Sequence, residues 1–221
     1  MKNLNQVKFN VFILMTALLL GVLPMSQAKA MDYLHLASAA KGLVDKQMAA
    51  GQQDGLSNQT SPNVTLNGCL AKTAFSPKGG GTELVVKTIE SAQKQIRLAA
   101  YSFTEPAIGK ALFDAHKRGV DVAVVLDTEH NGRKSTASVA DYLASNGVPV
   151  RVTRAFKIMH NKFVVVDGVT VETGSFNFSR AAETSNAENV LVISQCPSLA
   201  SSYLPVWGRI WDTGVALKGG Y

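Results

Sequence analysis

The sequence predicts an α/β sandwich in which helices cover a central sheet. From Cys69 onward, apolar runs of strand length alternate with amphipathic stretches of helix length. Glycine, proline and small polar residues separate these stretches, as expected of turns. A chain of 221 residues with 46% hydrophobic and 17% charged residues is long enough for a proper core and is typical of a globular protein.

The elements follow in order from their apolar periodicity and their end signals. The expected strands are 69–75, 96–101, 120–126, 148–152, 162–166, 169–171 and 189–194. The expected helices are 82–94, 106–119, 135–146 and one that begins at Pro197. Thr82 is a candidate N-cap, and Asp167-Gly168 is a two-residue hairpin turn between adjacent strands.

The first thirty residues have the pattern of a secretory signal peptide. Two lysines precede an almost unbroken apolar run, and Ala28-Lys29-Ala30 ends the segment with small residues. We therefore expect residues 1–30 to be removed and the mature chain to be periplasmic or secreted. An uncleaved membrane anchor is the alternative, but the apolar run is short for a span of about 20 residues. Residues 31–68 are expected to hold a helix followed by a flexible linker, and residues 69–221 the α/β domain.

The charge balance permits a polyanionic partner without requiring one. The whole chain has 22 Lys and Arg against 16 Asp and Glu, a net charge of +6. The first thirty residues hold three lysines and no acid, which leaves 19 basic against 16 acidic residues, or +3, after their removal. Two groups of basic residues could together follow a nucleic-acid backbone: Arg133 and Lys134, in the loop after the strand that ends near Asp127, and Arg151, Arg154 and Lys157, which approach the expected strand 162–166. Taken singly, each is expected to be solvated surface.

Cys69 and Cys196 are the only cysteines. In an oxidising compartment they could form a disulfide, and two unpaired thiols are the alternative. Their spacing is not that of a metal site.

The most informative stretch is His160-Asn161-Lys162, followed by Asp167 and by Gly174-Ser175-Phe176-Asn177. Residues two apart on a strand point the same way, so we expect an imidazole and an ammonium side by side. An imidazole can act as nucleophile or proton carrier near neutral pH. The ammonium, with the side chains of Ser175 and Asn177, can hold phosphoryl oxygens where negative charge develops. This combination suits attack on a phosphate ester.

These residues resemble the H-x-K-x4-D motif of the phospholipase D superfamily. The similarity extends from about Phe75 to Trp211 and is closest to the small bacterial endonuclease branch of that superfamily. Three stretches support it besides the motif: Tyr101–Thr104, Lys117–Val122 and Val169–Phe178. The resemblance implies that residues 69–221 are a catalytic domain with the α-β-α sandwich of that superfamily, a central mixed sheet and one H-K-D motif in each chain.

The resemblance also implies roles for individual residues. His160 would be the nucleophile that forms a phosphohistidine, and Lys162 would bind nonbridging oxygens. Asp167 completes the catalytic motif, although an Asp-Gly turn is also favoured for conformational reasons alone. Glu188 would hydrogen-bond the nucleophilic histidine, although an exposed glutamate before a strand is otherwise unremarkable.

A single motif in each chain implies a homodimer. The leaving oxygen needs a proton donor, which a second H-K-D motif supplies in this superfamily, so His160 of two subunits would share one site. We expect no cofactor and no metal requirement, because Lys162 carries the positive charge that a metal would supply and no cluster of metal ligands is evident.

The sequence therefore predicts a metal-independent, nonspecific endonuclease that cleaves DNA. A phospholipase D that hydrolyses phosphatidylcholine-type lipids is the alternative with the same chemistry. A noncatalytic nucleic-acid-binding protein of the envelope is the alternative of another class.

Overall fold

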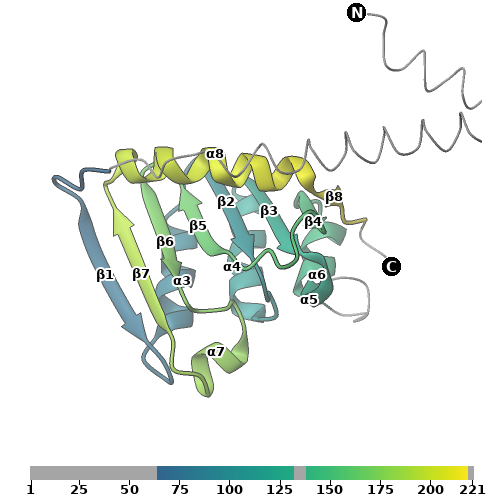
Figure 1. Ribbon diagram of the computed structural model, residues 1–221, viewed down its shortest axis with the longest axis horizontal. Helices are drawn as coiled ribbons and strands as arrows, with labels where there is room; N and C mark the ends of the chain where they lie inside the picture. The colour runs from purple at the N-terminus through teal and green to yellow at the C-terminus, as the bar shows by residue number, and fades with distance from the viewer. Residues whose placement is uncertain (1–63, 132–137, 219–221) are drawn as a thin grey trace, which may run out of the picture. The chain divides into compact units, whose positions relative to one another are not determined.

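The computed structural model describes residues 64–131 and 138–218, whose strands form one eight-stranded sheet (Figure 1). Its strand order is β1-β7-β6-β5-β2-β3-β4-β8. The strands are β1 (Leu70–Phe75), β2 (Gln95–Ala100), β3 (Asp121–Asp127), β4 (Val150–Thr153), β5 (Lys162–Val166), β6 (Thr170–Gly174), β7 (Asn189–Ser194) and β8 (Val215–Ala216). The expected signal peptide, most of the expected linker and residues 132–137 lie outside the described residues.

Helices cover both faces of the sheet, so the expected α/β sandwich is confirmed. The helices are α3 (Gly81–Glu90), α4 (Pro106–Lys117), α5 (Thr128–Asn131), α6 (Val139–Ser145), α7 (Arg180–Thr184) and α8 (Pro197–Thr213). Alternation along each buried strand sends successive side chains to opposite faces. In β2, Leu98 joins the core beneath α3, α4 and α6, whereas Ala99 joins the core beneath α8. Figure 1 shows α8 lying across the strands. None of the described helices is long and apolar enough to span a membrane.

Parallel and antiparallel pairings meet at β2, which makes the sheet mixed. On one side β2 pairs in parallel with β3, and β3 with β4. On the other side β2 pairs antiparallel with β5, and the order continues antiparallel through β6 and β7 to β1. This arrangement brings the ends of β1, β2, β3 and β6 and the beginnings of β5 and β7 to one edge of the sheet. His160 lies at this edge, here called the His160 edge.

Most sequence-predicted elements are present, and two differences have clear causes. Thr82 was expected to cap the first helix with its side chain, but the N-cap of α3 is Gly80, and the Thr82 N–H donates instead to the Glu183 carboxylate at 2.7 Å. The same helix was expected to run to residue 94 and ends at Glu90. Beyond it, the backbone N–H groups of residues 93 and 94 donate to the carboxylate of Asp167 and so cannot continue the helical ladder.

Three short elements had no sequence prediction, namely α5, α7 and β8. Each has five residues or fewer, too few to show an apolar periodicity.

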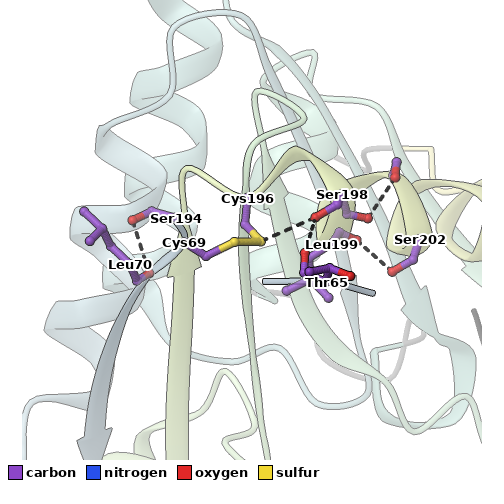
Figure 2. Close-up of a disulfide and its surroundings, with 9 residues drawn as sticks. Thr65, Cys69, Leu70, Ser194, Cys196, Ser198, Leu199 and Ser202 are labelled. Carbon is purple, nitrogen blue, oxygen red and sulfur yellow. Dashed lines mark hydrogen bonds between the residues drawn. A yellow bond between two sulfur atoms is a disulfide. The ribbon is translucent and has the colours of Figure 1, made fainter. Parts of the chain in front are cut away.

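A disulfide joins Cys69, just before β1, to Cys196, just before α8 (Figure 2). It lies at the edge opposite the His160 edge. Nearby, the Ser198 hydroxyl donates to the Thr65 carbonyl oxygen at 3.0 Å. A bridge between residues 127 positions apart can stabilise the fold by up to about 5 kcal/mol in the chain-entropy model. It fastens the outermost strand, which has β7 as its only neighbour in the described sheet.

Glu172 is the least expected residue of the core. It lies on β6 between Val164 of β5 and Val192 of β7, and none of its surface is exposed. Neither carboxylate oxygen has a hydrogen-bond partner among the described residues. Burial raises the pKa of Glu172 from 4.5 to about 8, so the side chain is mostly neutral at pH 7.

This burial makes stability depend on pH. Because the pKa of Glu172 is higher in the folded than in the unfolded protein, the free energy of unfolding falls as pH rises from about 4.5 to about 8. The slope is about 1.4 kcal/mol per pH unit in that window. Glu172→Gln stays neutral, so its melting temperature should fall less between pH 5 and pH 8 than that of the wild type. Glu90→Gln, at the exposed end of α3, should keep the wild-type slope. Equal slopes in the wild type and Glu172→Gln would contradict this account of the buried carboxyl group.

Candidate active site

Lys162 is the first residue of β5 and lies opposite Ala100, the last residue of β2. His160 precedes the strand in an irregular segment, so the expectation that both residues stand on one strand is wrong for His160. His160 is exposed, whereas Lys162 has only 7% of its surface exposed. The two are linked in another way: Lys162 Nζ donates to the backbone carbonyl oxygen of His160 at 2.8 Å.

The ammonium of Lys162 is held in a partly desolvated place. Burial lowers the pKa of Lys162, and the negative charge of Glu188 opposes that effect. Nζ also lies 5.2 Å from the centre of the Tyr101 ring, where the ring face attracts a cation. A desolvated ammonium with one carbonyl partner is well suited to bind an anion, because the anion replaces the interactions with water that the ammonium lost on burial.

Tyr101 contacts both residues of the H-x-K pair. Its ring meets the His160 imidazole edge to face, with the ring centres 4.5 Å apart and the planes at 61°. The same ring also faces the Lys162 ammonium, so Tyr101 positions the His160 and Lys162 side chains relative to each other. In the sequence this residue was noticed only as part of a similar stretch, because nothing in its local pattern reveals a partner 59 positions away.

Two buried polar residues, Asp127 at the end of β3 and Asn131 at the end of α5, hold the backbone on either side of this group. Asp127 accepts the N–H of Met159, the residue before His160, at 3.0 Å. Asn131 accepts the N–H of Phe103 at 2.9 Å and donates to the carbonyl oxygen of Tyr101. Asp127 and Asn131 are each only 5% exposed. Buried hydrogen bonds of this kind fix the loops that carry Tyr101 and His160.

These two residues were not found from the sequence. The available signal was a carboxylate at the end of an apolar strand and an amide four residues later, but their partners are backbone groups 28 to 32 positions away.

Ser175 and Asn177 follow the end of β6 at the His160 edge. The exposed Ser175 hydroxyl accepts the Asn189 N–H at 3.1 Å. The Asn177 Oδ1 is buried and has no hydrogen-bond partner among the described residues. An amide can turn by 180° and present its NH₂ group instead, so Asn177 has free capacity for a ligand oxygen. Gly174 lets the backbone pass close to Asn189, whose carbonyl oxygen would lie 2.1 Å from a Cβ at that position.

Glu188 lies just before β7, and its charge acts on Lys162. Its Oε1 accepts the side-chain N–H of Asn186 at 3.0 Å. The expected hydrogen bond from Glu188 to His160 is not among the contacts of the described residues. The carboxylate therefore belongs to the same charged group as the H-x-K pair, through Lys162 rather than through the imidazole.

Asp167 is placed away from the other residues of the predicted site. It follows the last residue of β5, and five residues of strand separate it from Lys162 by about 16 Å. Its carboxylate accepts the N–H groups of Gln93, Lys94 and Gln95, each at 2.8 Å. Partial burial raises the pKa of Asp167, but these three hydrogen bonds outweigh burial and leave the pKa below its usual value.

Asp167 therefore ties the β5–β6 turn to the start of β2. Its positive φ of 54° suits the first position of an Asp-Gly hairpin turn.

The basic residues considered for a nucleic-acid backbone divide into two groups. Arg154 and Lys157 are exposed on the segment that leads to His160. Arg151 instead stacks over the Trp211 ring at 4.4 Å and donates to the Trp211 carbonyl oxygen, so it fastens α8 to β4. Arg133 and Lys134 lie outside the described residues. Within residues 64–131 and 138–218, no three His, Cys, Asp or Glu side chains are grouped as metal ligands would be.

A mixed sheet with helices on both faces and an H-x-K pair at one edge defines a phospholipase D-like phosphodiesterase site. Comparison with known proteins agrees. Residues 85–211 match the family model described as "Cardiolipin synthase, PLD-like domain". The chain belongs to the phospholipase D superfamily.

Individual relatives carry different names. A protein named phospholipase D from Rickettsia bellii is 38% identical over 135 residues, which cover 61% of this chain and 66% of that protein. A mitochondrial cardiolipin hydrolase from Xenopus laevis is 35% identical over 121 residues, covering 55% of this chain and 56% of that one. The solved structure of Nuc, a phospholipase D family member from Salmonella typhimurium, is 45% identical with a TM-score of 0.66, and covers 68% of this chain and 99% of that one.

Tyr101→Leu tests the geometry of this site. Without the ring, His160 and Lys162 lose their common contact, and a misplacement of about 1 Å costs on the order of 100-fold in rate. We expect kcat for the chromogenic diester bis(p-nitrophenyl) phosphate to fall by about tenfold to 100-fold. Tyr142→Leu is the matched control, because Tyr142 makes a similar edge contact with Phe113 between α6 and α4. The control should lose thermal stability but keep kcat, and an unchanged kcat in folded Tyr101→Leu would contradict the assignment.

Proposed function

We propose that this protein is an exported, metal-independent endonuclease that hydrolyses phosphodiester bonds in DNA. One observation carries the proposal: His160, the desolvated ammonium of Lys162 and the unpaired side-chain oxygen of Asn177 lie at one edge of the sheet, in a chain whose sequence is 45% identical to that of Nuc in a match that covers 99% of Nuc. The exposed Arg154 and Lys157 beside His160 favour a long polyanion, because phosphate contacts of this kind need no particular base sequence.

The reaction proceeds in two displacements at phosphorus. In the first, an imidazole nitrogen of His160 forms a bond to phosphorus, while the bond from phosphorus to the leaving ester oxygen breaks. Lys162, Ser175 and Asn177 stabilise the negative charge on the nonbridging oxygens. In the second, water attacks the phosphohistidine and releases the imidazole. Lys162 supplies the positive charge, so neither step uses a metal ion.

The leaving oxygen takes its proton from His160 of a second subunit, and that histidine then accepts a proton from the attacking water. The exposure of His160 supports this arrangement, because a second subunit can reach the imidazole. The active form is accordingly a twofold homodimer with one shared site.

Export is part of the proposal and rests on residues 1–30. The disulfide between Cys69 and Cys196 supports it, since such bonds persist in the periplasm and outside the cell.

A phospholipase D activity is the second candidate. The names of the relatives from Rickettsia and Xenopus favour it, and so does Ile158, which is 51% exposed two residues before His160 and could contact a lipid surface.

The test is nicking of supercoiled plasmid by purified residues 31–221 in excess EDTA. We expect nicking by the wild type and a loss of at least about 1,000-fold in His160→Ala, because the nucleophile is gone. His116→Ala, on α4, should cleave as the wild type does. Retained cleavage in His160→Ala would overturn the mechanism.

Without nicking by the wild type, vesicles of phosphatidylcholine or cardiolipin distinguish the alternatives. Head-group release would identify a phospholipase. DNA binding without any cleavage would identify a noncatalytic binding protein.

The shared site predicts that an inactive subunit silences its partner. After subunit exchange with a ninefold excess of His160→Ala, only about a tenth of wild-type subunits keep a wild-type partner, so activity per wild-type subunit should fall to about a tenth. An equal excess of His116→Ala should cause no loss. Full activity in the presence of excess His160→Ala, or an active monomer in sedimentation, would rule out the shared site.

A further inference from the structure

Ser76 lies directly after β1 and outside the segment that matches the family model, yet it reaches the His160 edge. Its backbone N–H donates to the Glu188 carbonyl oxygen at 3.0 Å, and its hydroxyl accepts the Glu188 N–H at 3.1 Å. The same hydroxyl donates to the Asn186 carbonyl oxygen at 3.0 Å. Ser76 thus uses its backbone donor and both functions of its hydroxyl on one three-residue segment, more than 100 positions away.

That segment lies between α7 and β7, and β1 and the residues after it hold both of these elements. On the α7 side, the Lys78 N–H donates to the carbonyl oxygen of Glu183, a residue of α7, at 2.7 Å. At its near end, β1 pairs with β7 from Phe75 opposite Asn189 onward. Within the segment, the Asn186 amide donates to Glu188 Oε1 at 3.0 Å. The Ser76 hydroxyl therefore holds the backbone of Asn186 and of Glu188. The hydrogen bond between the side chains of these two residues sets the position of the Glu188 carboxylate.

We propose that Ser76 is a positioning residue for the active site: its hydrogen bonds to Asn186 and Glu188 hold the Glu188 carboxylate in the charged group that includes Lys162. The proposal rests on the proposed function for its catalytic consequence. Its structural part, the hydrogen bonds that tie Ser76 to Asn186 and Glu188, stands independently of the substrate.

The groups around Lys162 determine whether its pKa should rise or fall when Ser76 is replaced. His160 lies two residues before Lys162 on the same segment, Tyr101 faces the ammonium from just after β2, and the charge of Glu188, just before β7, acts on it. Burial lowers the pKa of Lys162, and Glu188 is the neighbouring charge that raises it. If Ser76 no longer holds the segment, the carboxylate moves away more often. The pKa of Lys162 then falls, and the ammonium loses its proton at a lower pH.

The experiment follows the Lys162 side chain by NMR in protein labelled with ¹³C and ¹⁵N at lysine, with Lys162→Arg to assign the signal. In Ser76→Ala the midpoint of the Lys162 titration should move to lower pH, whereas Ser76→Thr, which keeps a hydroxyl, should leave it near the wild-type position. Ser194→Ala is the matched control. Its hydroxyl donates to the Leu70 carbonyl oxygen at the opposite end of the same β1–β7 pair. This control should leave the titration unchanged.

Glu188→Gln completes a double-mutant cycle. It should lower the titration midpoint by itself, and Ser76→Ala in that background should cause no further change. For plasmid nicking, kcat of Ser76→Ala should fall by about tenfold and the alkaline limb of the pH–rate profile should move to lower pH.

The outcomes separate the two claims. An unmoved Lys162 titration in Ser76→Ala would overturn the inference, even if stability or kcat declined, because the role would then be structural only. Additive shifts in the cycle would overturn it too. If wild-type protein nicks no DNA, the endonuclease proposal fails, while the NMR titration still decides the role of Ser76.

Discussion

The pairing of β2 with β5 is the constraint on which the site depends. It joins the parallel half of the sheet to the antiparallel half, and its last rung sets Ala100 opposite Lys162. Tyr101 directly follows β2, one residue beyond that rung, and its ring contacts His160, which lies two residues before β5. A shift of the register by one residue would turn Lys162 to the other face and separate it from the tyrosine ring. Backbone hydrogen bonds thus determine the meeting of three side chains.

The ionisable side chains buried in this protein have three kinds of surroundings. The carboxylate of Asp127 is satisfied by backbone N–H groups, including that of Met159 beside the site. Glu172 has no such partner and stays protonated in the core near neutral pH. Lys162 lies between these cases, since it has a carbonyl partner and an acidic neighbour but too little water. A ligand that brings negative charge completes the surroundings of Lys162, whereas it would gain nothing at the other two residues.

The sequence predicted the strands and the α/β class well, because buried strands and amphipathic helices carry their own periodicity. It also predicted His160, Lys162, Ser175 and Asn177, which the structure places at one edge. Asp167 shows the limit of a motif, since a carboxylate required by its spacing lies at the far end of β5 and binds three backbone N–H groups.

Tyr101, Asn131, Asp127 and Ser76 could not be found from the sequence for a related physical reason. Each acts mainly on a ring or on backbone atoms brought near by strand order. Backbone atoms are the same in nearly every residue, so a contact with a backbone atom does not require a particular residue type at the partner position and cannot be inferred from the sequence.

The bridge from Cys69 to Cys196 turns the middle of the chain into a covalent ring, and every residue assigned to the site lies within it. The residues before Cys69 and after Cys196 are tails on that ring. A single protease cut anywhere inside the ring would leave one covalently connected molecule, with Tyr101, His160 and Glu188 still joined through the sulfur atoms. Two cuts, or one cut with reduction, are needed before any part of the site can diffuse away. This closure separates damage to the backbone from loss of the active site.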